Sequence, residues 1–166
     1  MKNIFLIGFM GAGKSTVARH LQKRLKMNLA EMDERIEKEQ GMTIPEIFEK
    51  YGESRFRDLE SELILTIGKE GNTIVSCGGG VVVRPENIEY MKKNGRVFYL
   101  KTSPETVYNR VKDSTNRPIL NGNMNVEYIA GLMEKRRTLY EGAADITITT
   151  DGKSVDEITD EIIIAI

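Results

Sequence analysis

The feature that most constrains the fold of this sequence is the stretch GFMGAGKST, residues 8–16, which directly follows the apolar run KNIFLI, residues 2–7. Its first eight residues match the pattern G-x-x-x-x-G-K-[ST], which joins a strand to a helix around the phosphates of a nucleotide. Glycine reaches backbone angles that are closed to other residues, so successive N–H groups can turn inward toward phosphate oxygens. The stretch therefore predicts a buried strand, a phosphate-binding loop and a helix, in that order.

The polar residues of this loop have separate predicted roles. Lys14 supplies a positive charge to the outer phosphates, and the Ser15 hydroxyl is placed to ligate Mg²⁺. The helix that begins near Lys14 adds the positive end of its dipole. A plain glycine turn with an exposed lysine is the alternative, but the complete pattern in a strand–loop–helix context favours nucleotide binding. The residues predicted to bind the nucleotide here are Gly11, Ala12, Gly13, Lys14, Ser15 and Thr16.

Short apolar runs alternate with helical patterns along the rest of the chain. Further strands are predicted at 28–33, 73–77, 96–100 and 145–149. Helices are predicted at 43–51, 56–67, 85–94, 103–111 and 126–141, and from 154 onward. Three of these helix starts carry capping residues, namely Thr43 with Glu46, Ser103 before Pro104, and Ser154 with Glu157.

This alternation predicts the fold class. Strands that alternate with helices favour an α/β fold, in which a largely parallel sheet is covered on both faces. With the first strand included, the sheet has five strands and the fold is a three-layer α/β/α sandwich. No repeat or linker divides the sequence, so we expect one domain over residues 1–166.

Composition narrows the classes of partner and compartment. The formal charge is −1 with mixed signs, so no basic excess indicates nucleic acid or an anionic membrane. No apolar run is long enough to cross a bilayer, and the N-terminal run lacks the features of a signal peptide. The one cysteine, Cys77, fits a reducing cytoplasm and is expected to be a small buried residue. The one histidine, His20, is expected at the surface.

The phosphate-binding loop leaves the reaction open, because many enzyme classes use it. A guanine-reading N-K-x-D segment is absent, and the third predicted strand carries no acidic residue. Two carboxylates instead follow the second strand, as Glu31 and Asp33. In an extended segment they would lie on the same side, where one could assist Mg²⁺ and the other could meet an acceptor hydroxyl. A pair of solvated acids is the alternative.

Three more groups of residues suggest a site for the acceptor. Arg57 lies in RFRDLE, Gly78, Gly79 and Gly80 follow the third strand, and Arg136 belongs to EKRRTLY. A loop of three glycines lets backbone N–H groups approach a ligand closely. Arg117 lies in NRPIL, within the turn-rich residues 113–125, which we expect to be a mobile loop. The arginines could also belong to solvated helix faces.

Taken in order, these segments resemble the shikimate kinase family. The resemblance covers nearly the whole chain: the phosphate-binding loop, E-x-D, FRDLE, GGG, NRPIL and KRRTLY. It implies a P-loop kinase fold with strand order 2-3-1-4-5, an acceptor-binding subregion at about 33–60 and a mobile lid at about 113–125. The implied reaction transfers the γ-phosphoryl group of ATP to the 3-hydroxyl of shikimate, with Mg²⁺, on the path to chorismate. The resemblance also implies a monomer.

The resemblance assigns roles at the acceptor site. Asp33 would hold the shikimate hydroxyls and be the candidate base, and Lys14, Asp33 and Arg117 would be the catalytic residues. Arg57 and Arg136 would grip the carboxylate, which guanidinium groups match bidentately. The residues that would bind shikimate are Asp33, Arg57, Gly78, Gly79, Gly80 and Arg136.

Further roles concern the nucleotide and the metal. Arg117 would close with the lid toward the phosphates, and Arg110 would lie near the adenine. Ser15 and Glu31 would form the metal site, although the family usually has Asp where this chain has Glu31. Arg137 follows Arg136 by one residue, so on a helix it should point elsewhere.

Two rival classes of function stay open at this point. A kinase for a nucleotide or a sugar acid would share the phosphate-binding loop and the lid. A nucleotide-binding regulatory module would share the loop without catalysis. The arginine pair and the glycine triplet favour a small carboxylate as the acceptor.

Overall fold

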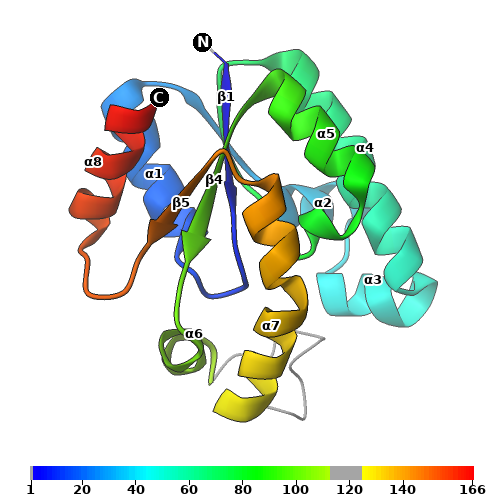
Figure 1. Ribbon diagram of the computed structural model, residues 1–166. Helices are drawn as coiled ribbons and strands as arrows, with labels where there is room; N and C mark the ends of the chain where they lie inside the picture. Colours follow the sequence, from blue (N-terminus) through cyan, green and yellow to red (C-terminus); the bar gives the residue numbers. More distant parts are fainter. Residues whose placement is uncertain (1, 113–124) are drawn as a thin grey trace.

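A computed structural model of the chain describes residues 2–112 and 125–166. Its five strands are all parallel and follow the order β2-β3-β1-β4-β5 (Figure 1). The strands are β1 (Asn3–Ile7), β2 (Asn28–Glu31), β3 (Thr73–Ser76), β4 (Gly95–Lys101) and β5 (Ile146–Thr149). The predicted sheet and strand order are confirmed. The predicted lid lies outside the described residues except for Asn125, and so does Arg117.

Helices cover both faces of this sheet, as the three-layer prediction requires. In Figure 1, α1 and α8 lie on one side, and α4, α5 and α7 lie on the other. The described helices are α1 (Lys14–Leu25), α2 (Met32–Gln40), α3 (Ile44–Tyr51), α4 (Glu53–Glu70), the 3₁₀ turn η1 (Val81–Val83), α5 (Pro85–Asn94), α6 (Pro104–Val111), α7 (Val126–Ala143) and α8 (Val155–Ala165). None of these helices is long and apolar enough to cross a membrane.

The central strand β1 separates two apolar cores. Phe5 and Ile7 contribute to the core beneath α4, α5 and α7, whereas Ile4 and Leu6 contribute to the core beneath α1 and α8. Successive side chains of a strand point to opposite faces, so a strand covered on both faces is apolar throughout. This arrangement explains the unbroken apolar run that precedes the phosphate-binding loop.

The predicted caps form at the expected residues. Thr43 and Glu46 make a complete capping box at α3, and Ser154 and Glu157 make another at α8. The Ser103 side chain accepts a hydrogen bond from the Thr106 amide at the start of α6. These local signals fix where the helices begin, independently of the cores they later join.

The prediction of an extended segment up to Asp33 is wrong. β2 ends at Glu31, and Met32 begins the helix α2, so Asp33 lies in a first helical turn. Met32 and Ile36 are buried at helical spacing, and acidic residues in the first turn favour the positive end of the helix dipole. Glu31 and Asp33 therefore do not share one side of a strand. They lie at the junction of β2 and α2.

Close packing of β4 against β1 predicts the effect of one substitution. A Cβ atom on Gly95 would lie 2.2 Å from the backbone oxygen of Asn3, which the sheet holds in place. We expect Gly95→Ala to lower the free energy of unfolding by about 1–3 kcal/mol. Gly131 lies in α7 with open space around it, so Gly131→Ala should raise stability by up to about 1 kcal/mol. Urea unfolding of both variants checks this, and equal effects would contradict the packing described.

Candidate active site

The phosphate-binding loop joins β1 to α1 and depends on left-handed backbone at two glycines. Gly11 has φ +80° and Gly13 has φ +92°, a region that other residues enter at a cost. Gly13 directly precedes the first residue of α1. Among the described residues, no side chain caps this end of the helix. The N–H groups at this helix start are therefore available to an anion.

Lys14 folds back over this loop. Its buried Nζ atom donates hydrogen bonds to the backbone oxygens of Gly8, at 2.6 Å, and Phe9, at 2.9 Å. The loop thus holds an ammonium group beside the N–H groups of the helix start. A lysine in this position supplies the positive charge predicted from the sequence.

A cleft of about 390 Å³ opens beside the loop. It extends across the carboxyl ends of β2 and β3, where open α/β sheets place their ligands. Most residues predicted to bind the nucleotide, the metal or the acceptor meet in its wall, namely Gly11, Gly13, Lys14, Ser15, Thr16, Glu31, Asp33, Gly79 and Arg110. The side chain of Ala12 is instead buried in the core beneath α1.

Hydroxyl and carboxylate oxygens line part of this cleft together with the guanidinium group of Arg19. The Ser15 hydroxyl lies 3.3 Å from that of Ser76, and Arg19 Nη2 lies 3.1 and 3.3 Å from the two carboxylate oxygens of Glu31. Burial works to raise the pKa of Glu31, but hydrogen bonds with Glu34 and Ser15 and the charge of Arg19 outweigh it. The net pKa is below the ordinary value, so Glu31 is ionised at neutral pH.

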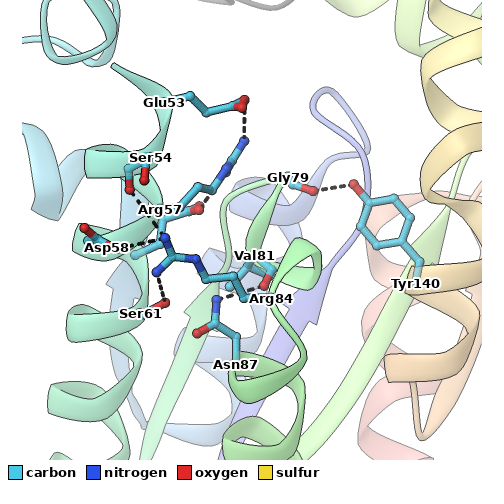
Figure 2. Close-up of polar contacts among 11 residues, drawn as sticks. Glu53, Ser54, Arg57, Asp58, Ser61, Gly79, Val81, Arg84, Asn87 and Tyr140 are labelled. Atoms are coloured by element: carbon cyan, nitrogen blue, oxygen red, sulfur yellow. Dashed lines mark hydrogen bonds and ion pairs between the residues drawn. The ribbon is translucent and has the colours of Figure 1, made fainter. Parts of the chain in front are cut away.

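Arg57 and Glu60 form a buried ion pair on α4. Nη1 of Arg57 lies 2.6 Å from Oε1 of Glu60, and Nη2 lies 3.5 Å from Oε1 of Glu53. Figure 2 shows the Arg57 side chain reaching toward the carboxylate of Glu53. Burial raises the pKa of Glu60 to about 6, although the charge of Arg57 opposes this effect.

Gly78, Gly79 and Gly80 form a loop after β3, here called the glycine loop, which lies in direct contact with these charged groups. A Cβ atom on Gly80 would lie 2.2 Å from Nη1 of Arg57. On Gly78 it would lie 2.6 Å from Oε2 of Glu60 and 2.9 Å from Oδ1 of Asp33. Only glycine lets the backbone approach these groups so closely.

The two adjacent arginines of α7 point in different directions, as predicted. Arg136 reaches the glycine loop, where its Nη1 atom lies 3.7 Å from the position of a Cβ on Gly79. Arg137 forms exposed ion pairs with Glu134 and Glu141. One arginine of KRRTLY therefore joins the site, and the other belongs to the surface.

Arg110 lies on the other side of the phosphate-binding loop. Its Nη1 atom donates to the backbone oxygen of Gly11 at 2.9 Å, and it borders Gly13. The guanidinium group therefore lies at the nucleotide side of the cleft.

His20 pairs with Asp156 at the surface, and Cys77 is buried, which raises its thiol pKa far above the ordinary range. Both match the sequence predictions.

Glu60 and Tyr140 escaped prediction as site residues, and so did Ser76 and Arg19 in the cleft. Glu60 stands three residues after Arg57, a helical spacing that could have indicated the ion pair. Tyr140 stands four residues after Arg136, and its hydroxyl donates a hydrogen bond to the backbone oxygen of Gly79 (Figure 2). An apolar residue at that spacing would have looked the same, so the sequence gives no specific signal for this contact.

The raised pKa of Glu60 predicts a pH-dependent stability difference. Its folded pKa of about 6 exceeds the ordinary value of 4.5, so its contribution is complete below pH 4.5 and is lost as the pH rises through 6. Between pH 7 and pH 4.5, the wild type should gain about 2 kcal/mol of unfolding free energy relative to Glu60→Gln. Urea unfolding of both proteins at the two pH values measures this difference. A pH-independent difference would contradict the burial of an ionisable Glu60.

Known proteins resemble this chain in sequence and in structure. The family model described as shikimate kinase matches residues 10–166. The shikimate kinase of Thermodesulfovibrio yellowstonii is 46% identical over 98% of this chain and 94% of that protein. The shikimate kinase of Persephonella marina is 45% identical over 98% of each chain.

Solved structures give the same result. A shikimate kinase from Acinetobacter baumannii in complex with shikimate superposes with a TM-score of 0.94 at 35% identity, and covers 98% of this chain and 91% of that one. The shikimate kinase from Aquifex aeolicus gives a TM-score of 0.85 at 37% identity, over 98% of this chain and 95% of that one. The similarity therefore extends over the whole fold.

Proposed function

The chain belongs to the shikimate kinase family, whose members are kinases that transfer phosphate to shikimate, and on this premise we propose that it phosphorylates the 3-hydroxyl of shikimate with ATP and Mg²⁺. The observation that carries this proposal is the convergence of two guanidinium groups and a carboxylate on the glycine loop. Arg57, Arg136 and Asp33 come from three different helices and meet beside the phosphate-binding cleft.

The acceptor side suits a small molecule with one carboxylate and several hydroxyls. Two guanidinium groups match a carboxylate, whereas a nucleotide base offers them no anionic partner. Within the described residues, Oε2 of Glu60 is buried and accepts no hydrogen bond, and it borders the glycine loop. A hydroxyl donor of the acceptor would satisfy such an atom.

The nucleotide side suits ATP. The N–H groups of the loop and the helix start would hold the β-phosphate, and Lys14 would contact the outer phosphates. Arg110 would lie near the adenine. We retain Arg117 and the lid at about 113–125 as predictions of a group that closes on the phosphates.

The residues present fit Mg²⁺. They offer hard oxygen ligands from Ser15 and Glu31, with Ser76 nearby, and the described residues contain no cluster of three or more acidic, His or Cys ligands. Mg²⁺ commonly binds through few protein ligands together with substrate phosphates and water. When bound, it would neutralise charge on the phosphate oxygens. We propose Ser15 as a direct ligand and Glu31 as the accompanying carboxylate.

The reaction itself would require little covalent chemistry from the protein. The 3-hydroxyl oxygen forms a bond to the γ-phosphorus, and the bond to the oxygen that bridges the β- and γ-phosphorus atoms breaks, so ADP leaves. Asp33 orients the attacking hydroxyl and accepts its proton late. Arg57 and Arg136 hold the carboxylate so that the hydroxyl stays aligned, and Lys14 stabilises the charge on the transferred group.

Further expectations from the sequence belong to the same proposal. These are one kinase domain over residues 1–166 with an acceptor-binding subregion at about 33–60, a monomeric state and a cytoplasmic location. The single cysteine is in keeping with a reducing compartment.

Release of ADP from ATP and Mg²⁺ tests the proposed reaction directly. We expect shikimate to stimulate it strongly, and quinate, gluconate and AMP to have little effect. Stimulation by AMP or gluconate in place of shikimate would leave the nucleotide site intact and overturn the acceptor. Binding of ATP without stimulation by any acceptor would favour the regulatory module.

A matched pair of substitutions tests the carboxylate grip. Lysine cannot form the bidentate pair of a guanidinium group, so Arg136→Lys should raise the KM for shikimate about tenfold or more. The KM for ATP should stay unchanged. Arg137→Lys alters the neighbouring, exposed arginine and should leave both constants unchanged. Equal effects of the two variants would remove Arg136 from the acceptor site.

The proposed metal site predicts a change in Mg²⁺ dependence. Glu31→Ala removes one carboxylate from the cleft, so half-maximal activity should require about three- to tenfold more Mg²⁺. A titration of activity against Mg²⁺ at saturating ATP and shikimate measures this. An unchanged titration would take Glu31 out of the metal site.

A further inference from the structure

The buried hydroxyl of Tyr140 connects two parts of the proposed acceptor site. Tyr140 lies on α7 and is 1% exposed. Figure 2 shows its ring crossing from α7 toward the glycine loop, where the hydroxyl donates to the backbone oxygen of Gly79. The side chain of Arg136, one helical turn earlier, interacts with the same hydroxyl and borders Gly79 as well. A single oxygen atom therefore contacts both the loop and the guanidinium group.

The direction of these polar contacts follows from the chemistry of the partners. A carbonyl oxygen can only accept, and a guanidinium group can only donate. The tyrosine proton therefore points to Gly79, and the lone pairs of the hydroxyl oxygen are left for the guanidinium group of Arg136. Burial raises the pKa of Tyr140 to about 12, so the hydroxyl keeps its proton at neutral pH. The polarity of this connection is thus fixed.

The position of the ring is fixed as well. Tyr99 on β4 stacks against Tyr140, with ring centroids 5.1 Å apart and ring planes at 22°. Tyr99 is also buried, and it belongs to the sheet rather than to a helix. The sheet therefore holds the ring of Tyr140 through Tyr99, and the hydrogen bond to Gly79 holds its hydroxyl.

We propose that Tyr140 is a positioning residue. It holds the guanidinium group of Arg136 and the glycine loop in the relative positions that bind the carboxylate of the acceptor. This inference rests on the proposed function. Without the hydroxyl, Gly79 loses its donor and the Arg136 guanidinium loses an acceptor that fixes its orientation. The carboxylate would then bind to a guanidinium group free to change its rotamer, and the cost of ordering it would reduce affinity.

Two phenylalanine variants separate the hydroxyl from the ring. Tyr140→Phe keeps the stacked ring and removes the hydroxyl. Tyr99→Phe removes a hydroxyl from the other member of the same stack and is the matched control. We expect Tyr140→Phe to raise the KM for shikimate about tenfold, because the lost contacts include one to a charged group. The KM for ATP should stay within about twofold in both variants, and Tyr99→Phe should leave the KM for shikimate unchanged.

A double-mutant cycle with Arg136→Lys distinguishes positioning from general structural support. If Tyr140 acts through Arg136, the double variant should bind shikimate about as weakly as Arg136→Lys alone, because coupled residues are not additive. Additive losses would overturn the inference, and so would equal losses for shikimate and ATP. An effect of Tyr99→Phe as large as that of Tyr140→Phe would assign the loss to ring packing and overturn it too.

A spectroscopic measurement keeps the inference testable even if Tyr140→Phe does not fold. In protein labelled with ¹³C-carbonyl glycine, the Gly79 resonance should shift in Arg136→Lys, where Tyr140 is intact, and stay in place in Arg137→Lys. An unshifted Gly79 resonance would overturn the connection. Absence of shikimate-stimulated ADP release from the wild type would instead overturn the proposed function, so the two failures are distinguishable.

Discussion

The candidate acceptor site depends on the absence of side chains on the loop that follows β3. A Cβ atom on Gly80 would overlap the Arg57 guanidinium group, and one on Gly78 would crowd the carboxylates of Glu60 and Asp33. Backbone without side chains can approach charged groups that come from α2 and α4 on one side and from α7 on the other. The three glycines thus define the space in which these helices can meet.

This close approach has an electrostatic consequence. Arg57 and Glu60 are both removed from water, and desolvation offsets much of the attraction within a buried ion pair. The pair is therefore a poor source of stability. Its effect is geometric, because Glu60 holds the guanidinium plane of Arg57 against the loop. Tyr140 has a comparable relation to Arg136 across the same loop, through a neutral hydroxyl.

The sequence predicted what local chemistry determines and missed what depends on tertiary contacts. The phosphate-binding loop, the helix caps at Thr43, Ser103 and Ser154, and the strand order through the family resemblance are confirmed. The predicted end of the second strand at Asp33 was wrong, because a short apolar run does not distinguish the end of a strand from the start of a helix.

Side-chain partners between distant elements were the least predictable part. Arg57, Arg136 and the glycine triplet were identified as separate segments, but their mutual distances come from how α4 and α7 pack on the sheet. The contact between Tyr140 and Gly79 joins residues 61 positions apart in the chain. No pattern within either segment specifies it.

Calorimetric binding of shikimate to Gly80→Ala tests most directly whether the loop's lack of side chains creates the acceptor site. Gly80 has ordinary backbone angles, so alanine introduces the methyl group at Arg57 without backbone strain. The account predicts that shikimate affinity falls by about tenfold or more while ADP affinity is unchanged. Shikimate affinity equal to that of the wild type would contradict it.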